Sequence, residues 1–347
     1  MSAPETEADP GSLPEVSVVC AWYNRSAYLQ ASLDSLLAQS HDNFEIVLVD
    51  DGSTDPRLRE ILARYDDPRL RVIHQENAGF TRAIRRAIDA STGRYVALQG
   101  AGDISFSNRL ARQAAFLDAH PDYAAVSCGY NNALIDRDKL HLPLPVDRPG
   151  FNGSGPKSGQ LRLEVTPEMI MSRNPFTHGE VMIRRSAHDA VGGYRTFFAN
   201  AQDKDLWLRL IAHHRLGVLE DWLYQRHTFA ADGIATSLRK LLVQTAYSMV
   251  AERCWHQRQA GRQDDVDRYG ALALMRVPMG PKTTRRVLRS VKQAEYYGTL
   301  DPADLVVVRD LYGPVHHVLS RLLLGYLSMR RKAPAETPRP ARSNRVR

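Results

Sequence analysis

Two clusters of polar residues have the types and spacing of a nucleoside site. Each follows a short apolar, β-branched run: residues 21–25 (Ala-Trp-Tyr-Asn-Arg) follow the first run, and Asp50-Asp51 follows the second. An aromatic ring such as Tyr23 can stack on a base, and a carboxylate can accept the N3–H of uracil or thymine, or a ribose hydroxyl. Together they predict a pyrimidine nucleoside site. Taken alone, Asp50-Asp51-Gly-Ser is more simply a turn with an Asx hydrogen bond.

Other familiar cofactor sites are missing from the sequence. No Gly-x-Gly-x-x-Gly follows the first apolar run and no Gly-Lys-Ser/Thr motif occurs, so a dinucleotide or ATP would lack its phosphate cradle. The histidines show no metal-ligand spacing such as His-Glu-x-x-His. Three widely spaced cysteines exclude a disulfide scaffold and a Cys-based zinc finger, and they fit a reducing compartment. With no apolar leader and no apolar run of about 18 residues, we expect a cytoplasmic protein.

The segments around these clusters alternate between strand-like and helix-like patterns. From residue 15 to about residue 128, short apolar runs alternate with apolar residues at helical spacing, as in β-α units around a parallel sheet. Ligands of such sheets bind beyond the carboxyl ends of the strands, where both polar clusters would lie. The expected strands are residues 16–20, 44–49, 70–74, 95–98 and 124–128. The Gly- and Pro-rich residues 147–160 predict a loop or lid.

Composition divides the chain into four parts. We expect a disordered leader (1–14), an α/β catalytic domain (15–230), a helical accessory region (231–329) and a disordered basic tail (330–347). The net charge is +7, but the tail holds seven basic residues and one acidic residue, so the remainder is nearly neutral. A nucleic-acid binder would need a basic face on the folded body. We therefore expect no nucleic-acid partner.

Five dispersed segments, in order and spacing, resemble the family 2 inverting glycosyltransferases of GT-A fold over about residues 15–228. The segments are residues 18–25, 35–39, 44–55, 77–79 and 93–97. The resemblance implies a Rossmann-like, mostly parallel central sheet flanked by helices, followed here by a helical C-terminal region. It also implies a nucleotide-sugar donor, usually UDP- or TDP-linked, and a hydroxyl acceptor on a glycan or glycolipid in cell-surface polysaccharide synthesis. Carried onto this chain, the nucleotide-binding residues after the first strand are Ala21, Tyr23 and Asn24, with Tyr23 stacking on the base. Asp51 reads the pyrimidine, and Asp50 supports Asp51 or the ribose.

The chain departs from this family at the metal-binding aspartates. Members carry Leu-Asp-Ala-Asp-Asp, whereas this chain reads Gln-Gly100-Ala101-Gly102-Asp103. Magnesium and manganese need several hard oxygen ligands, and Asp103 is the one carboxylate left. We therefore expect that no metal cofactor is required, with a weak Mg or Mn site at Asp103 as the alternative. The glycines would let the backbone approach the donor diphosphate, or they would serve a tight turn with no ligand.

Without a metal, the charge on the departing diphosphate must be neutralised by cations and backbone N–H groups. By the resemblance, Arg82 lies near the diphosphate; a solvated helix face explains it equally well. Arg226 resembles a late basic residue of the family that touches the donor phosphates. His178 falls where the family often lines the sugar and acceptor pocket, although a lone histidine is more often structural.

Inverting transfer needs a base for the acceptor hydroxyl. Gly192-Gly-Tyr194 and the following residues 201–209 resemble the family segment that carries this base, which makes Asp203 the candidate. Asp205 is expected to cap a helix or to form a salt bridge. The alternative function is a non-catalytic nucleotide-sugar binding protein that kept the nucleoside pocket after losing its metal site.

Residues 315–329 place leucines on one side of a helix and run into the basic residues 330–332. An amphipathic helix beside a polybasic stretch predicts peripheral contact of residues 315–347 with an anionic membrane, here the inner face of the plasma membrane. A terminal helix docked on the protein fits the same pattern. The sequence leaves both interpretations open.

Overall fold

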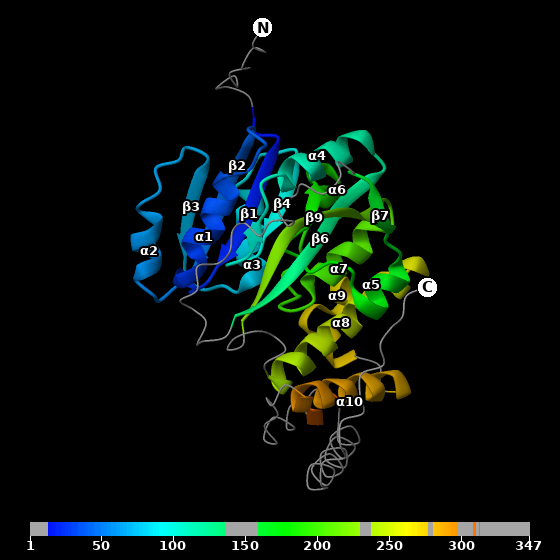
Figure 1. Cartoon of the computed structure of the whole chain (residues 1–347). Coiled ribbons are helices and arrows are strands. Elements are labelled where there is room, and N and C mark those ends of the chain that lie inside the picture. The colour runs from blue at the N-terminus through cyan, green and yellow to red at the C-terminus, as the bar shows by residue number, and fades with distance from the viewer. Residues whose placement is uncertain are drawn as a thin grey trace, which may run out of the picture. The chain divides into compact units, whose positions relative to one another are not determined.

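The computed structural model describes residues 13–135, 159–229, 237–276, 280–296, 308–309 and 312. A nine-stranded sheet in the order β3-β2-β1-β4-β8-β6-β9-β5, with β7 on β9, organises the chain (Figure 1). The pairings give six strands that run in one direction (β3, β2, β1, β4, β6, β9) and three that run against them (β8, β5, β7). The expected α/β class with a mostly parallel sheet is confirmed.

The five predicted strands are present; four lie within two residues of their expected bounds, whereas the fifth, expected over 124–128, continues to residue 135. They are β1 (Val16–Trp22), β2 (Phe44–Asp51), β3 (Leu70–Gln75), β4 (Tyr95–Gln99) and β6 (Tyr123–Ile135). All residues of β1 and of β4 are buried, because helices cover both faces of the sheet. These two strands are therefore mostly apolar rather than alternating in sequence, with Ser17 and Gln99 as buried polar residues.

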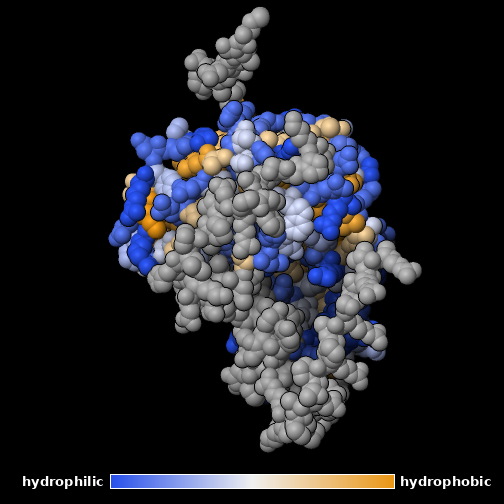
Figure 2. Space-filling model, viewed as in Figure 1, coloured by the Kyte–Doolittle hydropathy of each residue, from blue (hydrophilic) through white to orange (hydrophobic). Residues whose placement is uncertain are grey.

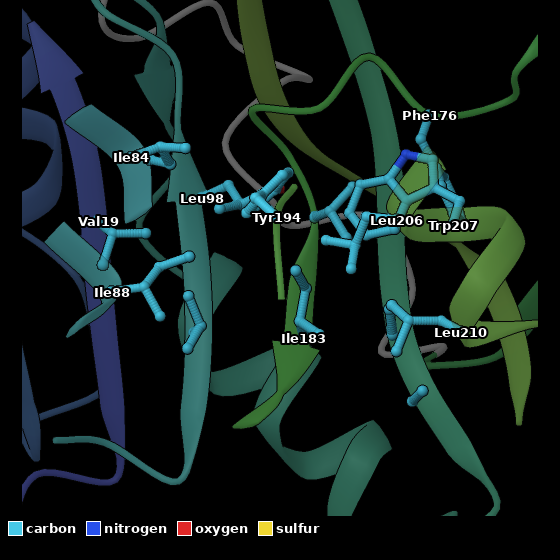
Figure 3. Packing of buried hydrophobic residues seen from close by; sticks show 14 of the residues in the cluster. Val19, Ile84, Ile88, Leu98, Phe176, Ile183, Tyr194, Leu206, Trp207 and Leu210 are labelled. Atoms are coloured by element: carbon cyan, nitrogen blue, oxygen red, sulfur yellow. The ribbon is translucent and has the colours of Figure 1, made fainter. Parts of the chain in front are cut away.

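Two layers of helices bury the sheet. The first layer contains α3 (Phe80–Asp89), α5 (Pro167–Arg173), α6 (Arg185–Ala190) and α7 (Gln202–Leu210), and it packs on Val19, Val49 and Leu98. Figure 3 shows Ile84 and Ile88 of α3 and Leu206 and Trp207 of α7 in this layer. The opposite layer contains α1 (Ser26–Leu37), α2 (Arg57–Leu62) and α4 (Arg109–Ala119). The described residues visible in Figure 2 are mostly hydrophilic, as this burial requires.

The remaining strands extend the sheet beyond β4. They are β5 (Ile104–Ser105), β7 (Leu161–Glu164), β8 (Met182–Arg184) and the long β9 (Arg215–Phe229). Strand β9 pairs with β5, β6 and β7. Through β5 and β6 it brings its residues beside residues 104–105 and 123–135, which lie much earlier in the chain.

The C-terminal region contains α8 (Leu238–Gln259), α9 (Asp265–Tyr269), a 3₁₀ helix (Gly270–Arg276) and α10 (Pro281–Tyr296). The chain divides into two compact units: residues 1–233 with 247–276, and residues 234–246 with 277–347. The expected boundary near residue 230 lies close to the change from the first unit to the second after residue 233. The expected accessory region 231–329, however, is shared between the two units, because α9 and most of α8 belong to the sheet unit.

Several expectations concern residues that the structure does not describe. The leader (except residues 13 and 14), the loop 147–160 (except 159 and 160) and residues 315–347 lie outside the described ranges. Within those ranges, no helix combines the length and the apolar character needed to cross a bilayer.

Candidate active site

The loop after β1 presents Tyr23 at the carboxyl end of the sheet. Its side chain is 48% exposed, although Trp22 and Ala21 before it are buried. The backbone turns sharply at Asn24 and Arg25, which both have positive φ (54° and 57°). Asn24 is fixed by the neighbouring loop, because its N–H donates to Ser53 Oγ (2.8 Å) and its Oδ1 accepts from Thr54 N–H (2.9 Å). The Tyr23 ring is thus held on an ordered turn and is accessible for stacking.

Asp50 is buried at the end of β2, and both of its oxygens are engaged. Oδ1 accepts from the backbone N–H of Ser53 (3.0 Å), which confirms the Asx-type turn. Oδ2 lies 2.9 Å from His74 Nδ1. His74 stands opposite Asp50 in the parallel register of β2 and β3. His74 ends the predicted strand 70–74, so aligning the ends of the two predicted strands is the signal that would have identified this partner of Asp50.

Asp51 holds the start of α3 against the sheet. Its Oδ1 accepts from Gln75 Nε2 (2.6 Å) and from Ala78 N–H (2.8 Å), and its Oδ2 accepts from Gly79 N–H (3.0 Å). A carboxylate has about four acceptor positions, so one remains for a further donor. Asp51 therefore has a structural role that the sequence did not reveal. Its predicted contact with the base of the nucleotide needs the one acceptor position that remains on its carboxylate.

Helix α3 begins at this edge and exposes Arg82. Gly79 precedes the helix with φ 86°, and no side chain caps the first turn. The Arg82 side chain is exposed, and within the described residues its one hydrogen bond is a long contact (3.4 Å) to the Ala78 carbonyl oxygen. Arg86 instead donates to Gln75 Oε1 (3.0 Å). Among the arginines of α3, Arg82 has the place and exposure suited to an anion at the helix N-terminus.

Asp103 points into the protein. It follows β4 in the turn 100–103 and is 8% exposed. Its Oδ1 accepts from His227 N–H (2.7 Å) and its Oδ2 accepts from the Tyr224 hydroxyl (2.8 Å). Burial raises the pKa of Asp103, while these hydrogen bonds and the charge of the nearby Arg226 oppose that rise. Both oxygens of the carboxylate that the sequence left as a candidate metal ligand are therefore held inward by hydrogen bonds from β9.

The glycines of this turn are explained by the turn itself. A Cβ atom on Gly100 would overlap the Asp103 carboxylate, lying 2.9 Å from its Cγ, and Gly102 has φ 91°. Ala101 contributes its carbonyl oxygen, which accepts from Arg25 NH1 (2.9 Å). Within the described ranges, no group of three or more His, Cys, Asp or Glu side chains could hold a metal ion. The residues of this turn do not fit a divalent cation.

Sequence reasoning missed the buried residues behind this turn. Tyr224 is fully buried and also accepts from Gly100 N–H (2.9 Å). The Arg109 guanidinium lies 4.9 Å from the centre of the Tyr224 ring and donates to Gln99 Oε1 (3.0 Å). Nothing in the local sequence distinguishes Arg109 from a solvated residue of α4. Two residues beyond Tyr224, the predicted Arg226 is exposed.

Asp203 lies in the first turn of α7, where Ala201 precedes the helix with φ 54° and no side chain caps it. Asn174 Nδ2 donates to Asp203 Oδ2 (2.9 Å). The Asp203 charge acts on His178 and Tyr194, whose side chains lie 2.8 Å apart between His178 Nε2 and the Tyr194 hydroxyl. Burial lowers the pKa of His178, so its imidazole is neutral near pH 7.

Asp205 has the structural role expected of it. It is fully buried and forms ion pairs with Arg195 and with Arg209, where Oδ2 lies 2.9 Å from Arg209 NH2. Arg195 forms a second ion pair, in which its NH1 lies 2.8 Å from Oδ2 of Asp264, the residue that caps α9. The salt-bridge prediction is confirmed. The network also ties the helix that carries Asp203 to the C-terminal helices of the same unit.

Three chains of contacts join these groups at one edge of the sheet. Arg25 links the Tyr23 loop to the turn 100–103. The Asp51 carboxylate fixes Gly79, and the next residue, Phe80, packs edge-on against His178 with ring centres 5.3 Å apart. Gly179 is so close to the turn that a Cβ atom on it would lie 2.9 Å from Gly100 N. The structure thus brings together the three predicted groups: the nucleoside loops, the turn 100–103, and His178 with Asp203.

This arrangement agrees with a comparison of the sequence with known families. The model of a family described as "Glycosyl transferase family 2" matches residues 17–204, more than half of the chain. The chain belongs to glycosyl transferase family 2. The expected family and enzyme class are therefore confirmed, and the match ends at the first turn of α7, one residue after Asp203.

Relatives within family 2 include putative glycosyltransferases of Bacillus subtilis. The putative glycosyltransferase EpsE is 32% identical over 219 residues, which cover 61% of this chain and 72% of EpsE. The putative teichuronic acid biosynthesis glycosyltransferase TuaG is 37% identical over 107 residues, or 30% of this chain and 42% of TuaG. The match covers only 22% of a further relative, the Sinorhizobium fredii protein y4gI.

Solved structures share the fold at low sequence identity. S. aureus TarS 1-349 in complex with UDP-GlcNAc matches with a TM-score of 0.51 and 17% identity, covering 89% of this chain and 88% of TarS 1-349. Mannosyltransferase PcManGT from Pyrobaculum calidifontis, in complex with GDP-Man and Mn²⁺, matches with a TM-score of 0.50 and 19% identity, covering 96% and 85%. Such likeness establishes the fold alone.

Proposed function

We propose that this family 2 glycosyltransferase moves a sugar, with inversion, from a UDP- or TDP-sugar to a hydroxyl of a glycan or glycolipid. The observation that carries the proposal is the convergence at one sheet edge. Exposed Tyr23 and the Asp50-Asp51 loop lie at one side, and Asp203 lies at the other, joined through Gly79, Phe80 and His178. A donor nucleotide and a base for the acceptor are the two parts that inverting transfer requires.

In the proposed reaction, Asp203 takes the proton of the acceptor hydroxyl as its oxygen attacks the anomeric carbon. The bond from that carbon to the diphosphate breaks on the opposite face of the sugar, and the nucleoside diphosphate leaves. Neutral His178 beside Asp203 is suited to hydrogen bonding with the sugar or the acceptor rather than to charge stabilisation. The neutral state of His178 thus fits its proposed part.

We propose that cations and backbone dipoles replace a metal at the diphosphate. Arg82 is exposed in the first turn of α3, and Arg226 is exposed near Asp103. A helix N-terminus with a nearby guanidinium stabilises a developing negative charge. The inward orientation of Asp103 supports this proposal, since both of its oxygens are already hydrogen-bonded.

The donor and the process are proposed in part from the relatives. TarS structures contain UDP and UDP-GlcNAc, whereas PcManGT contains GDP-Man. The nucleobase of the donor is therefore a point to be tested. TuaG and the Myxococcus xanthus O-antigen biosynthesis protein RfbC, 30% identical over 242 residues (68% of this chain, 17% of RfbC), carry names from polysaccharide synthesis. We propose a polysaccharide or its lipid-linked precursor as acceptor, reached through peripheral contact of residues 315–347 with an anionic membrane.

A panel of UDP-, TDP- and GDP-sugars tests the function. Thermal stabilisation identifies the donor, and release of the nucleoside diphosphate in the presence of glycan or lipid-linked acceptors measures transfer, each with and without EDTA. We expect UDP- or TDP-sugars to stabilise the protein and turnover to persist in EDTA. Binding without turnover for any acceptor would favour the non-catalytic alternative. Turnover that collapses in EDTA and returns with manganese would refute metal independence.

A further inference from the structure

We propose that Asn174 is a positioning residue for Asp203: its side-chain amide orients the carboxylate and favours its ionised form. The inference rests on the proposed function, in which Asp203 is the base. Asn174 follows α5, far from α7 in sequence, and it contacts Asp203 through one hydrogen bond, from Nδ2 to Oδ2 (2.9 Å). Neither the sequence motifs nor the comparisons single it out.

The orientation of the Asn174 amide is fixed by a second contact. Its Oδ1 accepts from the backbone N–H of Phe176 (3.2 Å), closing a turn over Pro175. An amide that accepts through its oxygen on one side must present its NH₂ group on the other. Asn174 therefore faces Asp203 as a donor, and donation to a carboxylate favours the charged, basic form.

The start of α7 gives this hydrogen bond a task. Ala201, the residue before the helix, has no polar side chain to cap it, and the positive N-terminal end of a helix attracts a carboxylate on its first turn. A bond from a separate segment holds Asp203 Oδ2 in one place against that attraction. In the described part of the chain, this is the one direct hydrogen bond that the Asp203 carboxylate receives from another side chain.

The other groups around Asp203 do not take over this role. Burial keeps His178 neutral and raises the pKa of Tyr194 well above its usual value, so both face Asp203 uncharged near pH 7. On α7 itself, Lys204 contacts Glu252 (2.6 Å) and Ser248 (2.8 Å). The remaining acid of the helix, Asp205, is engaged by Arg195 and Arg209. Asn174 is thus the polar group placed to set the position and proton affinity of Asp203.

Asn174→Asp is the decisive variant, because it keeps the oxygen that Phe176 N–H needs and replaces the donor by a second carboxylate. We expect the acidic limb of the kcat–pH profile to move up by about one pH unit, since a neighbouring like charge disfavours ionisation. At pH values below the acidic limb, kcat should fall about tenfold, whereas well above it the loss should be small. Donor KM and UDP affinity should stay within about twofold, because Asn174 does not touch the nucleoside loops.

Two further variants complete the comparison. Asn174→Ala removes both contacts and should shift the profile in the same direction by less. Asn43→Asp makes the same chemical change just before β2, at the opposite edge of the sheet, and should leave the profile unchanged. A wild-type profile for Asn174→Asp would overturn the proposal. A loss that is uniform in pH, or confined to KM, would also overturn it by assigning Asn174 only to the turn.

A measurement independent of turnover separates this proposal from the proposed function. In protein labelled with ¹³C at aspartate carboxyl carbons, the Asp203 signal is assigned from its disappearance in Asp203→Asn and is then titrated. We expect its pKa to rise in Asn174→Asp and in Asn174→Ala; an unchanged pKa would overturn the proposal even if no acceptor supports transfer. If the pKa rises but Asp203→Asn retains full activity, the assignment of the base fails instead.

Discussion

Gly100 and Asp103 compete for the same space: a Cβ atom on Gly100 would overlap the Asp103 carboxylate and lie 2.9 Å from its Cγ. That carboxylate cannot move without losing the Tyr224 hydroxyl and His227 N–H. The metal-binding pattern of the resembled family places carboxylates at both positions. An aspartate at position 100 and an inward Asp103 are therefore alternatives, and this chain has the second arrangement.

The first prediction follows from this crowding. Gly100→Ala should lower the free energy of unfolding by about 1–3 kcal/mol, the usual cost of disturbing a buried polar group and its partners. Gly280→Ala is the control, because a Cβ atom there would meet nothing within 4 Å. Denaturant unfolding of both variants measures the difference. An equal, small loss of stability in the two variants would show that the Asp103 side chain can move away from the new methyl group without destabilising the fold.

The sequence predicted the strands and the residues at their ends because both depend on local pattern. Apolar runs defined β1 to β4, and the polar residues after them lie where parallel strands must deliver them. The inward turn of Asp103 was not predictable in this way. Its partner Tyr224 lies 121 residues later on β9, and the antiparallel β5–β9 pair that brings it close has no local signal.

The division of the C-terminal region between the two units has no local signal in the sequence, for a related reason. Helical periodicity shows that α8 and α9 exist, but it does not show which unit they join. Buried ion pairs attach α9 to the sheet unit. Arg195, just after the Gly-Gly-Tyr segment, pairs with Asp205 of α7 and with Asp264 before α9. Such long-range ion pairs involve residue types that, taken alone, indicate a solvated surface.

The second prediction concerns Asp203. Asp203→Asn keeps the shape of the side chain and removes the base, so turnover should fall about 10²- to 10⁴-fold. UDP affinity should remain within about twofold, since Asp203 lies at the other side of the site from Tyr23. Release of UDP from a matching donor measures turnover, and calorimetry measures binding. Unchanged turnover would remove Asp203 from the mechanism.

The third prediction compares a buried with an exposed carboxylate. Asp205→Ala leaves the mostly buried Arg195 and the buried Arg209 without their shared partner and should cost about 3–5 kcal/mol of stability. Asp122→Ala breaks an ion pair with Arg215 in which both side chains are about half exposed, so it should leave the stability nearly unchanged. Urea unfolding midpoints give both values. Similar losses would contradict the structural role assigned to Asp205.

The fourth prediction is that stability falls as the pH drops below about 6.5. Burial lowers the pKa of His178, His188 and His227, so between the folded and unfolded pKa values the unfolded chain binds more protons than the folded protein. Asp103, with its raised pKa, acts in the opposite sense at lower pH. Unfolding free energies from pH 7.5 to 5.5 should decline, with a shallower slope for His188→Gln. A flat profile would contradict the neutral, buried histidines.

The last prediction tests the nucleoside site through stacking alone. Tyr23 is exposed on a turn that Asn24 fixes to the Ser53 loop, so its ring can be removed without disturbing the core. Tyr23→Ala should weaken UDP binding by about 1–3 kcal/mol, the usual contribution of an aromatic ring stacked on a base. Tyr23→Phe keeps the ring and should bind UDP within about twofold of the wild type. Calorimetric titration with UDP distinguishes the two. If Tyr23→Phe lost as much affinity as Tyr23→Ala, the hydroxyl rather than the ring would make the contact, and equal binding by all three proteins would place the nucleotide elsewhere.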